Sequence, residues 1–166
     1  VEFQDIPTAF VDAMVSIEDK RFYSHDGIDI IAIVRSAKAI LESGGELTQG
    51  GSTITMQLAR NVYLDNGKRW ERKIREMFIA AELEKLYSKN KIMEFYLNNI
   101  YFANGYYGIQ AACNGYFSCG LEDLSLSQIA FLCAIPNSPS YYDPIVNLEN
   151  TIGRRDRILK NMYEDG

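Results

Sequence analysis

Helical periodicity is the feature of this sequence that most limits the folds open to it. Apolar residues recur at three- and four-residue spacing along most of the chain, and the two-residue alternation of strands is nearly absent. Glycine pairs, an Asp-Asn-Gly turn and a proline-containing stretch separate the periodic segments. The predicted helices span about residues 8–21, 28–43, 54–61, 70–87, 91–102, 126–135 and 148–163. We therefore predict a single domain with a mainly α fold over residues 1–166.

Composition narrows the function classes. An apolar fraction of 47% fits a folded globular chain, and a net charge of −5 with a pI near 4.9 argues against a nucleic-acid partner. The three cysteines have no metal-ligand spacing and are predicted to be small buried residues. No stretch reaches the roughly 18 apolar residues of a membrane span. We expect any membrane anchor to lie outside this sequence.

One acidic residue lies on the apolar side of the first predicted helix. The apolar arc holds Phe10, Val11, Met14, Val15, Ile17 and Phe22, and outside it lie Asp12, Ser16, Asp19 and Lys20. Glu18 falls near the middle of this arc at about 100° per residue. A buried carboxylate is costly unless it is paired or hydrogen-bonded. Two interpretations stay open: an ion pair with Lys20, Arg21 or a distant arginine, or a general base or acid tuned by its surroundings.

A second polar cluster is GGSTITMQLARN, residues 50–61. Its two glycines permit close approach of a ligand to the backbone, and hydroxyl, amide and guanidinium groups follow at short intervals. Neither a Walker loop nor a dinucleotide fingerprint is present. An ordinary loop with a helix cap and a site for an anionic or sugar-bearing ligand both remain open. The loop over residues 44–53 is expected to be mobile.

The predicted helix over residues 70–87 carries a second carboxylate among cations. One apolar face holds Trp70, Ile74, Met77, Phe78 and Ala81, and an opposite face holds Ile79, Leu83 and Leu86, so burial on two sides is expected. Glu76 lies on the second face, one turn after Arg72, where a plain i,i+4 ion pair is the simplest interpretation. Two enclosed carboxylates with nearby cations also suit glycosyl transfer, which needs a base and positive charge for an anionic leaving group.

The segment over residues 28–43 is broadly apolar, with Arg35 and Lys38 as its interior cations. A core helix and a helix lying at a lipid interface both fit this pattern.

Five segments together resemble the motifs of glycosyltransferase family 51, the peptidoglycan glycosyltransferases of penicillin-binding proteins and their monofunctional relatives. In chain order they are EDKRFYSHDG, GGSTITMQLARN, RKIREMFIAAELE, KNKIMEFYLNNIYF and RRDRILKNM. The resemblance extends from about Thr8 to Met162, nearly the whole chain.

The resemblance implies roles for individual residues. Glu18 matches the general base that acts on the 4-hydroxyl of the acceptor sugar, and Glu76 matches a second glutamate at the donor side. Three residues match positions that shape the site around the base: Asp19, Phe22 and His25. The positions matching the donor side are Ser52, Thr53, Gln57, Arg60 and Asn61. The cations that would meet the donor pyrophosphate are Arg60, Lys68, Arg72 and Lys73.

The implied fold is a lysozyme-like helical head lobe, about residues 1–27 and 59–166, with a smaller membrane-proximal jaw lobe, about residues 28–58. The implied reaction is polymerisation of lipid II into a β-1,4-linked glycan strand, with inversion at the donor anomeric carbon and release of undecaprenyl pyrophosphate. Expected partners are lipid II, the growing glycan strand, the membrane surface through the jaw lobe, and other cell-wall synthesis proteins. The expected location is the extracytoplasmic face of the bacterial cytoplasmic membrane. The sequence requires no cofactor. Participation of a divalent cation, Mg²⁺ or Mn²⁺, stays open.

Two departures from the family pattern concern polar contacts. Met56 stands where the family often has Gln, and Ser118-Cys119 stand where it usually has Gly-Lys. Neither departure involves the two glutamates, so an intact site is expected. Two other functions stay open: a lysozyme-like lytic enzyme that cuts existing glycan, and a catalytically silent membrane or division-complex interaction module.

Overall fold

The computed structural model describes residues 1–45, 50–63 and 67–166. Within this part of the chain there are eight α-helices and no named strand, so the prediction of a mainly α fold is confirmed. A single antiparallel bridge joins Tyr101 and Tyr107. The helices are α1 (Thr8–Glu18), α2 (Ile30–Glu42), α3 (Ile54–Val62), α4 (Arg69–Leu86), α5 (Lys89–Asn99), α6 (Ile109–Phe117), α7 (Leu126–Cys133) and α8 (Leu148–Asp165). Short 3₁₀ turns precede α1 (Phe3–Asp5), follow it (Phe22–Ser24) and connect α6 to α7 (Leu121–Asp123).

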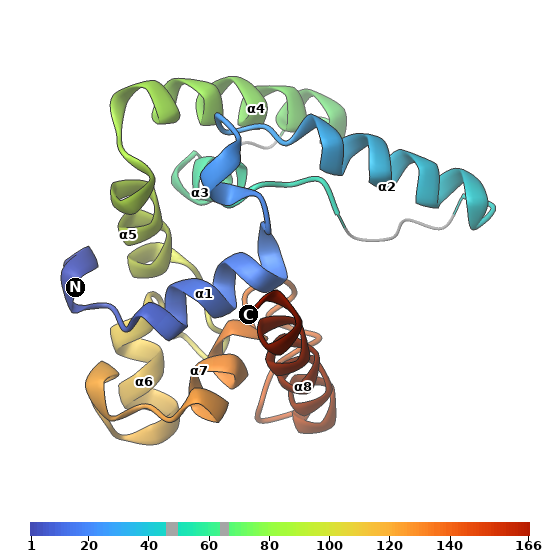
Figure 1. Ribbon diagram of the computed structural model, residues 1–166. Helices are drawn as coiled ribbons and strands as arrows, with labels where there is room; N and C mark the ends of the chain where they lie inside the picture. Colours follow the sequence, from blue (N-terminus) through green and yellow to red (C-terminus); the bar gives the residue numbers. More distant parts are fainter. Residues whose placement is uncertain (46–49, 64–66) are drawn as a thin grey trace.

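The core forms where α1 meets the helices of the second half of the chain. Helix α1 packs against α7 and α8, and α3 packs against both α4 and α5 (Figure 1). Phe10 and Met14 of α1, Tyr96 of α5 and Leu132 of α7 are fully buried there. Figure 1 shows α2 extending away from these helices, and α2 contains no buried residue. The interpretation of residues 28–43 as a core helix is therefore wrong.

Most helix ends lie within a few residues of their predicted positions, and the exceptions have local causes. Helix α1 ends at Glu18 rather than near Arg21, because Asp19 leaves helical geometry and a 3₁₀ turn follows. Thr8 is the first residue of α1 and makes no capping hydrogen bond. Helix α7 starts with a capping box, in which the side chains of Ser125 and Gln128 bond each other's backbone amides.

The sequence pattern did not predict helix α6. Asn114 and Gly115 near its C-terminal end are poor helix formers. Gly115 lies against the Tyr106 ring, which a Cβ atom at this position would approach to 2.2 Å. Tertiary packing therefore decides this helix rather than local propensity.

Helix α4 is not buried on two sides as predicted. Trp70, Ile74 and Phe78 are exposed on one of its predicted apolar faces, and Leu86 is exposed on the other. Only Glu76 and Ala80 are buried within α4. The prediction failed because periodicity indicates an apolar face without indicating what covers it.

Several smaller predictions have mixed outcomes. Cys113 and Cys133 are buried, Cys119 is partly buried, and all three are free. The predicted turn at residues 65–67 and the expected mobility of loop 44–53 depend on residues 46–49 and 64–66, which lie outside the described residues.

Candidate active site

Glu18 ends α1 with its side chain only 3% exposed, as its place in the apolar arc predicted. Arg154 of α8 donates from Nη2 to Glu18 Oε1 at 2.9 Å. Gln57 of α3 donates from Nε2 to Glu18 Oε2 at 3.0 Å. Each oxygen of this buried carboxylate therefore accepts one hydrogen bond, one from a cation and one from a neutral amide.

A hydrogen bond from Tyr96 fixes the orientation of the Gln57 amide. The Tyr96 hydroxyl donates to Gln57 Oε1 at 2.9 Å, so the amide nitrogen must face Glu18. Burial raises the pKa of Tyr96 well above 10.0, and the Glu18 carboxylate adds to this effect. The phenol therefore stays protonated and remains a donor.

Asp19 and His25 join the end of α1 to the start of α3. His25 Nδ1 accepts from the Gly27 amide at 3.0 Å, so Nε2 carries the proton and donates to Asp19 at 2.8 Å. Asp19 Oδ2 also accepts from the Ile54 amide at 3.0 Å, at the first turn of α3. Asp19 lies outside the apolar arc of the sequence and is nevertheless buried, because it ends α1 and its carboxylate turns inward to this network. Ser16 is likewise buried.

Phe22, Thr53 and Gly27 complete this junction. The Thr53 hydroxyl caps α3 by accepting from the Met56 amide at 3.1 Å, and it donates to the Gly27 carbonyl at 2.6 Å. Phe22 is fully buried, with the Lys89 ammonium 4.6 Å from its ring centroid. These side chains fix α1 relative to α3, which keeps Glu18 and Gln57 within hydrogen-bonding distance.

Glu76 of α4 forms the second buried carboxylate, 5% exposed and surrounded by three cations. Arg60 binds it through two hydrogen bonds, Nε to Oε1 at 2.9 Å and Nη2 to Oε2 at 3.2 Å. Arg72 Nε lies 3.7 Å from Oε1, and Lys73 Nζ lies 3.6 Å from Oε2. The cations themselves are about half exposed, so their outer sides remain accessible to an anionic ligand.

Lys73 also donates to the Ser52 hydroxyl. Burial lowers the pKa of Lys73 below its ordinary 10.5, with nearby Arg60 and Arg72 acting in the same direction and Glu76 opposing them. Ser52, which lies in the loop before α3, thus contacts the cation cluster of α4.

One turn of α3 connects the two carboxylates. Gln57 contacts Glu18, and Arg60, three residues later on the same helical face, contacts Glu76. The predicted residues Glu18, Gln57, Arg60 and Glu76 therefore belong to one continuous network.

Some predicted residues stand apart from this network. Asn61 and Lys68 are exposed, and neither makes a hydrogen bond or ion pair to a described residue of the site. Met56 is fully buried, so its side chain faces the interior rather than the ligand side. The described residues contain no group of three or more His, Cys, Asp or Glu side chains suited to a metal ion.

Arg154 and Tyr96 were not assigned to the site from the sequence. Arg154 lies in the motif-like segment RRDRILKNM, and the open interpretation of Glu18 as the partner of a distant arginine pointed toward it without naming it. No periodic signal links residue 154 to residue 18, because their contact depends on the packing of α8 against α1.

Comparisons with known proteins identify the family of the chain. The model of the family described as "Transglycosylase" matches residues 1–163. The chain is 45% identical over 166 residues to "Penicillin-binding protein 1F" of Bacillus subtilis (strain 168) and 43% identical to "Penicillin-binding protein 1A" of Aquifex aeolicus (strain VF5). It is 39% identical to "Penicillin-binding protein 1A" of Escherichia coli (strain K12).

All three matches cover 100% of this chain but only 23%, 23% and 19% of the respective relatives, so the chain spans about a fifth to a quarter of their length. The five motifs, the mainly α fold and the family match agree, and the chain belongs to the transglycosylase family.

Proposed function

We propose that this chain polymerises lipid II by glycosyl transfer. The observation that carries the proposal is the pair of buried carboxylates, Glu18 and Glu76, joined through one turn of α3 but paired with different cations. One is a carboxylate with a fixed orientation, which suits a base. The other organises a cluster of cations with exposed outer sides, which suits a charged leaving group.

In the proposed reaction, Glu18 takes the proton from the 4-hydroxyl of the acceptor sugar. The hydroxyl oxygen then forms a bond to the anomeric carbon of the donor while the bond from that carbon to the pyrophosphate oxygen breaks. Attack opposite the leaving group inverts the anomeric carbon and gives a β-1,4 linkage. The electron pair of the broken bond leaves with undecaprenyl pyrophosphate.

The leaving group gains negative charge in this step, so it needs preorganised cations. Arg60, Arg72 and Lys73 supply them, and Lys68 lies nearby in the chain at the start of α4. Glu76 keeps the three side chains converged at one place. Without it their mutual repulsion would spread them apart, so Glu76 acts through the cations.

The apolar face of α2 supports a membrane-facing role for the jaw lobe, residues 28–58. Ile30, Val34 and Leu41 are 70%, 63% and 83% exposed, and Arg35 and Lys38 provide charge for lipid headgroups. Among the described residues no helix has the length and hydropathy needed to cross a bilayer. We place the chain at the extracytoplasmic surface of the cytoplasmic membrane, where lipid II and other cell-wall synthesis proteins would meet it.

The test is incubation of the chain with labelled lipid II, with and without moenomycin, and in parallel with purified peptidoglycan. The proposal predicts moenomycin-sensitive glycan strands from lipid II and no fragments from peptidoglycan. Soluble fragments would support the lytic alternative instead. Binding of lipid II without turnover would support the silent module. Arms with EDTA, Mg²⁺ and Mn²⁺ show whether a divalent cation takes part.

A further inference from the structure

We propose that Arg154 is the positioning residue for Glu18, and that the Tyr142 ring holds Arg154 in place. This inference rests on the proposed function, in which Glu18 is the base. The pairing joins residues 136 positions apart, and both side chains are buried, at 5% and 3% exposure. An ion pair this far from solvent is well ordered only if its partners are held from several sides.

Arg154 is the cation that compensates Glu18, because the cations next to Glu18 in the chain are occupied elsewhere. Lys20 pairs with Asp165 at 3.1 Å, and Arg21 lies 3.2 Å from Asp29. Among the described residues, no other cation lies within ion-pair distance of Glu18. The charge balance of the buried base therefore depends on one guanidinium.

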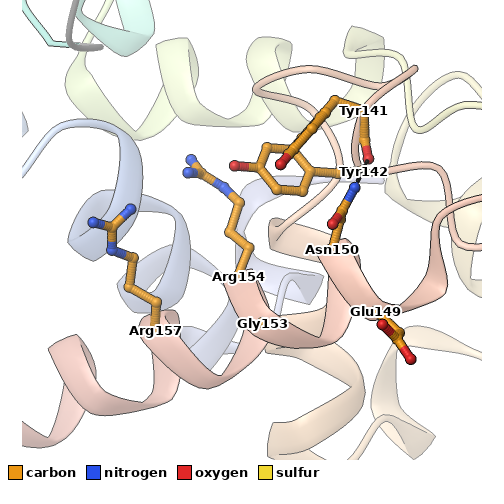
Figure 2. Close-up of a pocket in the computed structure, with 7 residues that line it drawn as sticks. All are labelled: Tyr141, Tyr142, Glu149, Asn150, Gly153, Arg154 and Arg157. Carbon is orange, nitrogen blue, oxygen red and sulfur yellow. Dashed lines mark hydrogen bonds between the residues drawn. The ribbon is translucent and has the colours of Figure 1, made fainter.

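Arg154 has few other contacts that could hold it. Its Nε atom is buried without a hydrogen-bond partner in the described structure. Its guanidinium carbon lies 5.1 Å from the centroid of the Tyr142 ring, a cation–π contact. Figure 2 shows this ring beside the guanidinium, with Arg154 and Arg157 projecting from the same side of α8.

The backbone of Tyr142 is tied to α8. The Thr151 hydroxyl, one turn before Arg154, lies 3.0 Å from the Tyr142 carbonyl and donates to it. Loop 136–147 thus places an aromatic ring against Arg154. On its open side this arrangement lines a cavity of about 320 Å³ between the loop and α8, bordered by Tyr141, Asn150 and Arg157.

The chemical consequence concerns orientation. Arg154 and Gln57 each hold one oxygen of Glu18, so the carboxylate plane cannot rotate, and one lone pair on each oxygen remains for the acceptor hydroxyl. Loss of Arg154 leaves Gln57 as a single tether and strands an uncompensated buried carboxylate. The base would then be misplaced while the donor-side cations stay intact.

The test is steady-state polymerisation of lipid II by Arg154→Met and Arg154→Lys, with Arg157→Met as the matched control. Arg157 lines the same cavity and makes no ion pair with Glu18. We expect kcat of Arg154→Met to fall roughly 10²-fold, the cost of a misplaced catalytic group, with KM little changed. Arg154→Lys should recover part of this loss, and Arg157→Met should keep the wild-type kcat. Wild-type kcat in a folded Arg154→Met would overturn the inference.

A second pair of variants tests the inference even if Arg154→Met does not fold. Tyr142 is partly exposed, so its substitution leaves the core intact. Tyr142→Leu removes the ring contact and should lower kcat, whereas Tyr142→Phe keeps the ring and should not. Equal kcat values for these two variants would contradict the role of the ring.

A spectroscopic readout separates this inference from the proposed function. In ¹³C-labelled protein, the Glu18 carboxyl signal can be assigned by its loss in Glu18→Gln. We expect that signal to shift in Arg154→Lys and to stay unchanged in Arg157→Met, whether or not the chain turns over lipid II. An unchanged signal in Arg154→Lys would overturn the positioning role. Absence of polymerisation by the wild-type chain would overturn the proposed function and leave this shift measurable.

Discussion

Glu18 and Glu76 are each buried beside their own cations, and the cations around Glu76 are of two kinds, arginine and lysine. Arg60 and Arg72 supply guanidinium groups, the usual choice of side chain for a persistent positive charge. Lys73 is different, because burial and two neighbouring arginines lower the pKa of its ammonium below 10.5. The cation cluster at Glu76 therefore contains one member that loses its charge at a lower pH than an ordinary lysine does.

This difference predicts the alkaline side of the pH–rate profile. A lowered pKa means that Lys73 is charged at low pH and loses its charge at a lower pH than an ordinary lysine. If its charge stabilises the leaving pyrophosphate, polymerisation slows as pH rises through that lowered pKa. In Lys73→Arg the charge persists, so the decline should move to higher pH.

The measurement is kcat/KM against pH for wild type, Lys73→Arg and the control Lys85→Arg. Lys85 lies in the same helix, pairs with Glu82 and is 70% exposed, so its replacement should leave the profile unchanged. An alkaline decline that does not move in Lys73→Arg would show that Lys73 does not set it.

At the scale of single elements, one glycine lets the segment that follows α1 pass close to α4. Gly27 has a φ of +96°, and a Cβ atom there would lie 2.8 Å from the Ala80 carbonyl oxygen of α4. Gly45 has a similar φ of +101°, but no atom of the described residues lies within 4 Å of its Cβ position. The two residues share a backbone conformation and differ in the space around them.

Gly27→Ala should therefore destabilise the fold more than Gly45→Ala. The left-handed conformation costs about 1–2 kcal/mol with a side chain present, in both variants. The steric overlap at Ala80 adds about 1–3 kcal/mol in Gly27→Ala alone. Urea unfolding followed by circular dichroism gives the two free energies. Equal losses would show that the close approach of Gly27 to α4 does not matter for stability.

The helices could largely be predicted from the sequence, because periodicity and capping are local properties. Helices α1, α3 and α7 start within a residue of their predicted positions. Helix α6 could not be predicted, since it forms where Gly115 accommodates the Tyr106 ring. The apolar pattern of α2 left a core helix and an interfacial helix open, and the pattern of α4 wrongly predicted burial, because an apolar face looks alike whether protein, lipid or water lies next to it.

At the scale of the whole molecule, the site depends on contacts between distant segments. The burial of Glu18 followed from its place in the helix, and the role of Glu76 among cations followed from neighbours within α4. The partners Arg154 and Tyr96 required the tertiary fold, which brings α5 and α8 to the end of α1. The motif series identified the family, but it did not indicate which side chains contact Glu18 and Glu76.

The exposed face of α2 predicts binding to membranes through one end of the molecule. Val34→Glu should weaken binding to vesicles of anionic phospholipid, because it places a carboxylate in the exposed apolar stripe of α2. Val146→Glu is the matched control, since Val146 has nearly the same exposure, 69% against 63%, but lies in the loop before α8. Vesicle co-sedimentation measures the binding. Equal binding by the two variants would contradict a membrane-facing role for α2.

The central claim is that Glu18 is the base of a lipid II polymerase, and one variant tests it most directly. Glu18→Gln keeps the size of the side chain, and its one carbonyl oxygen can accept from Arg154 or from Gln57. Because the buried guanidinium loses its counter-charge, we expect a folded but less stable variant, as checked by circular dichroism. Its polymerisation of labelled lipid II should fall by at least about 10²–10⁴-fold, the usual contribution of a general base. Strand synthesis by a folded Glu18→Gln near the wild-type rate would contradict the account.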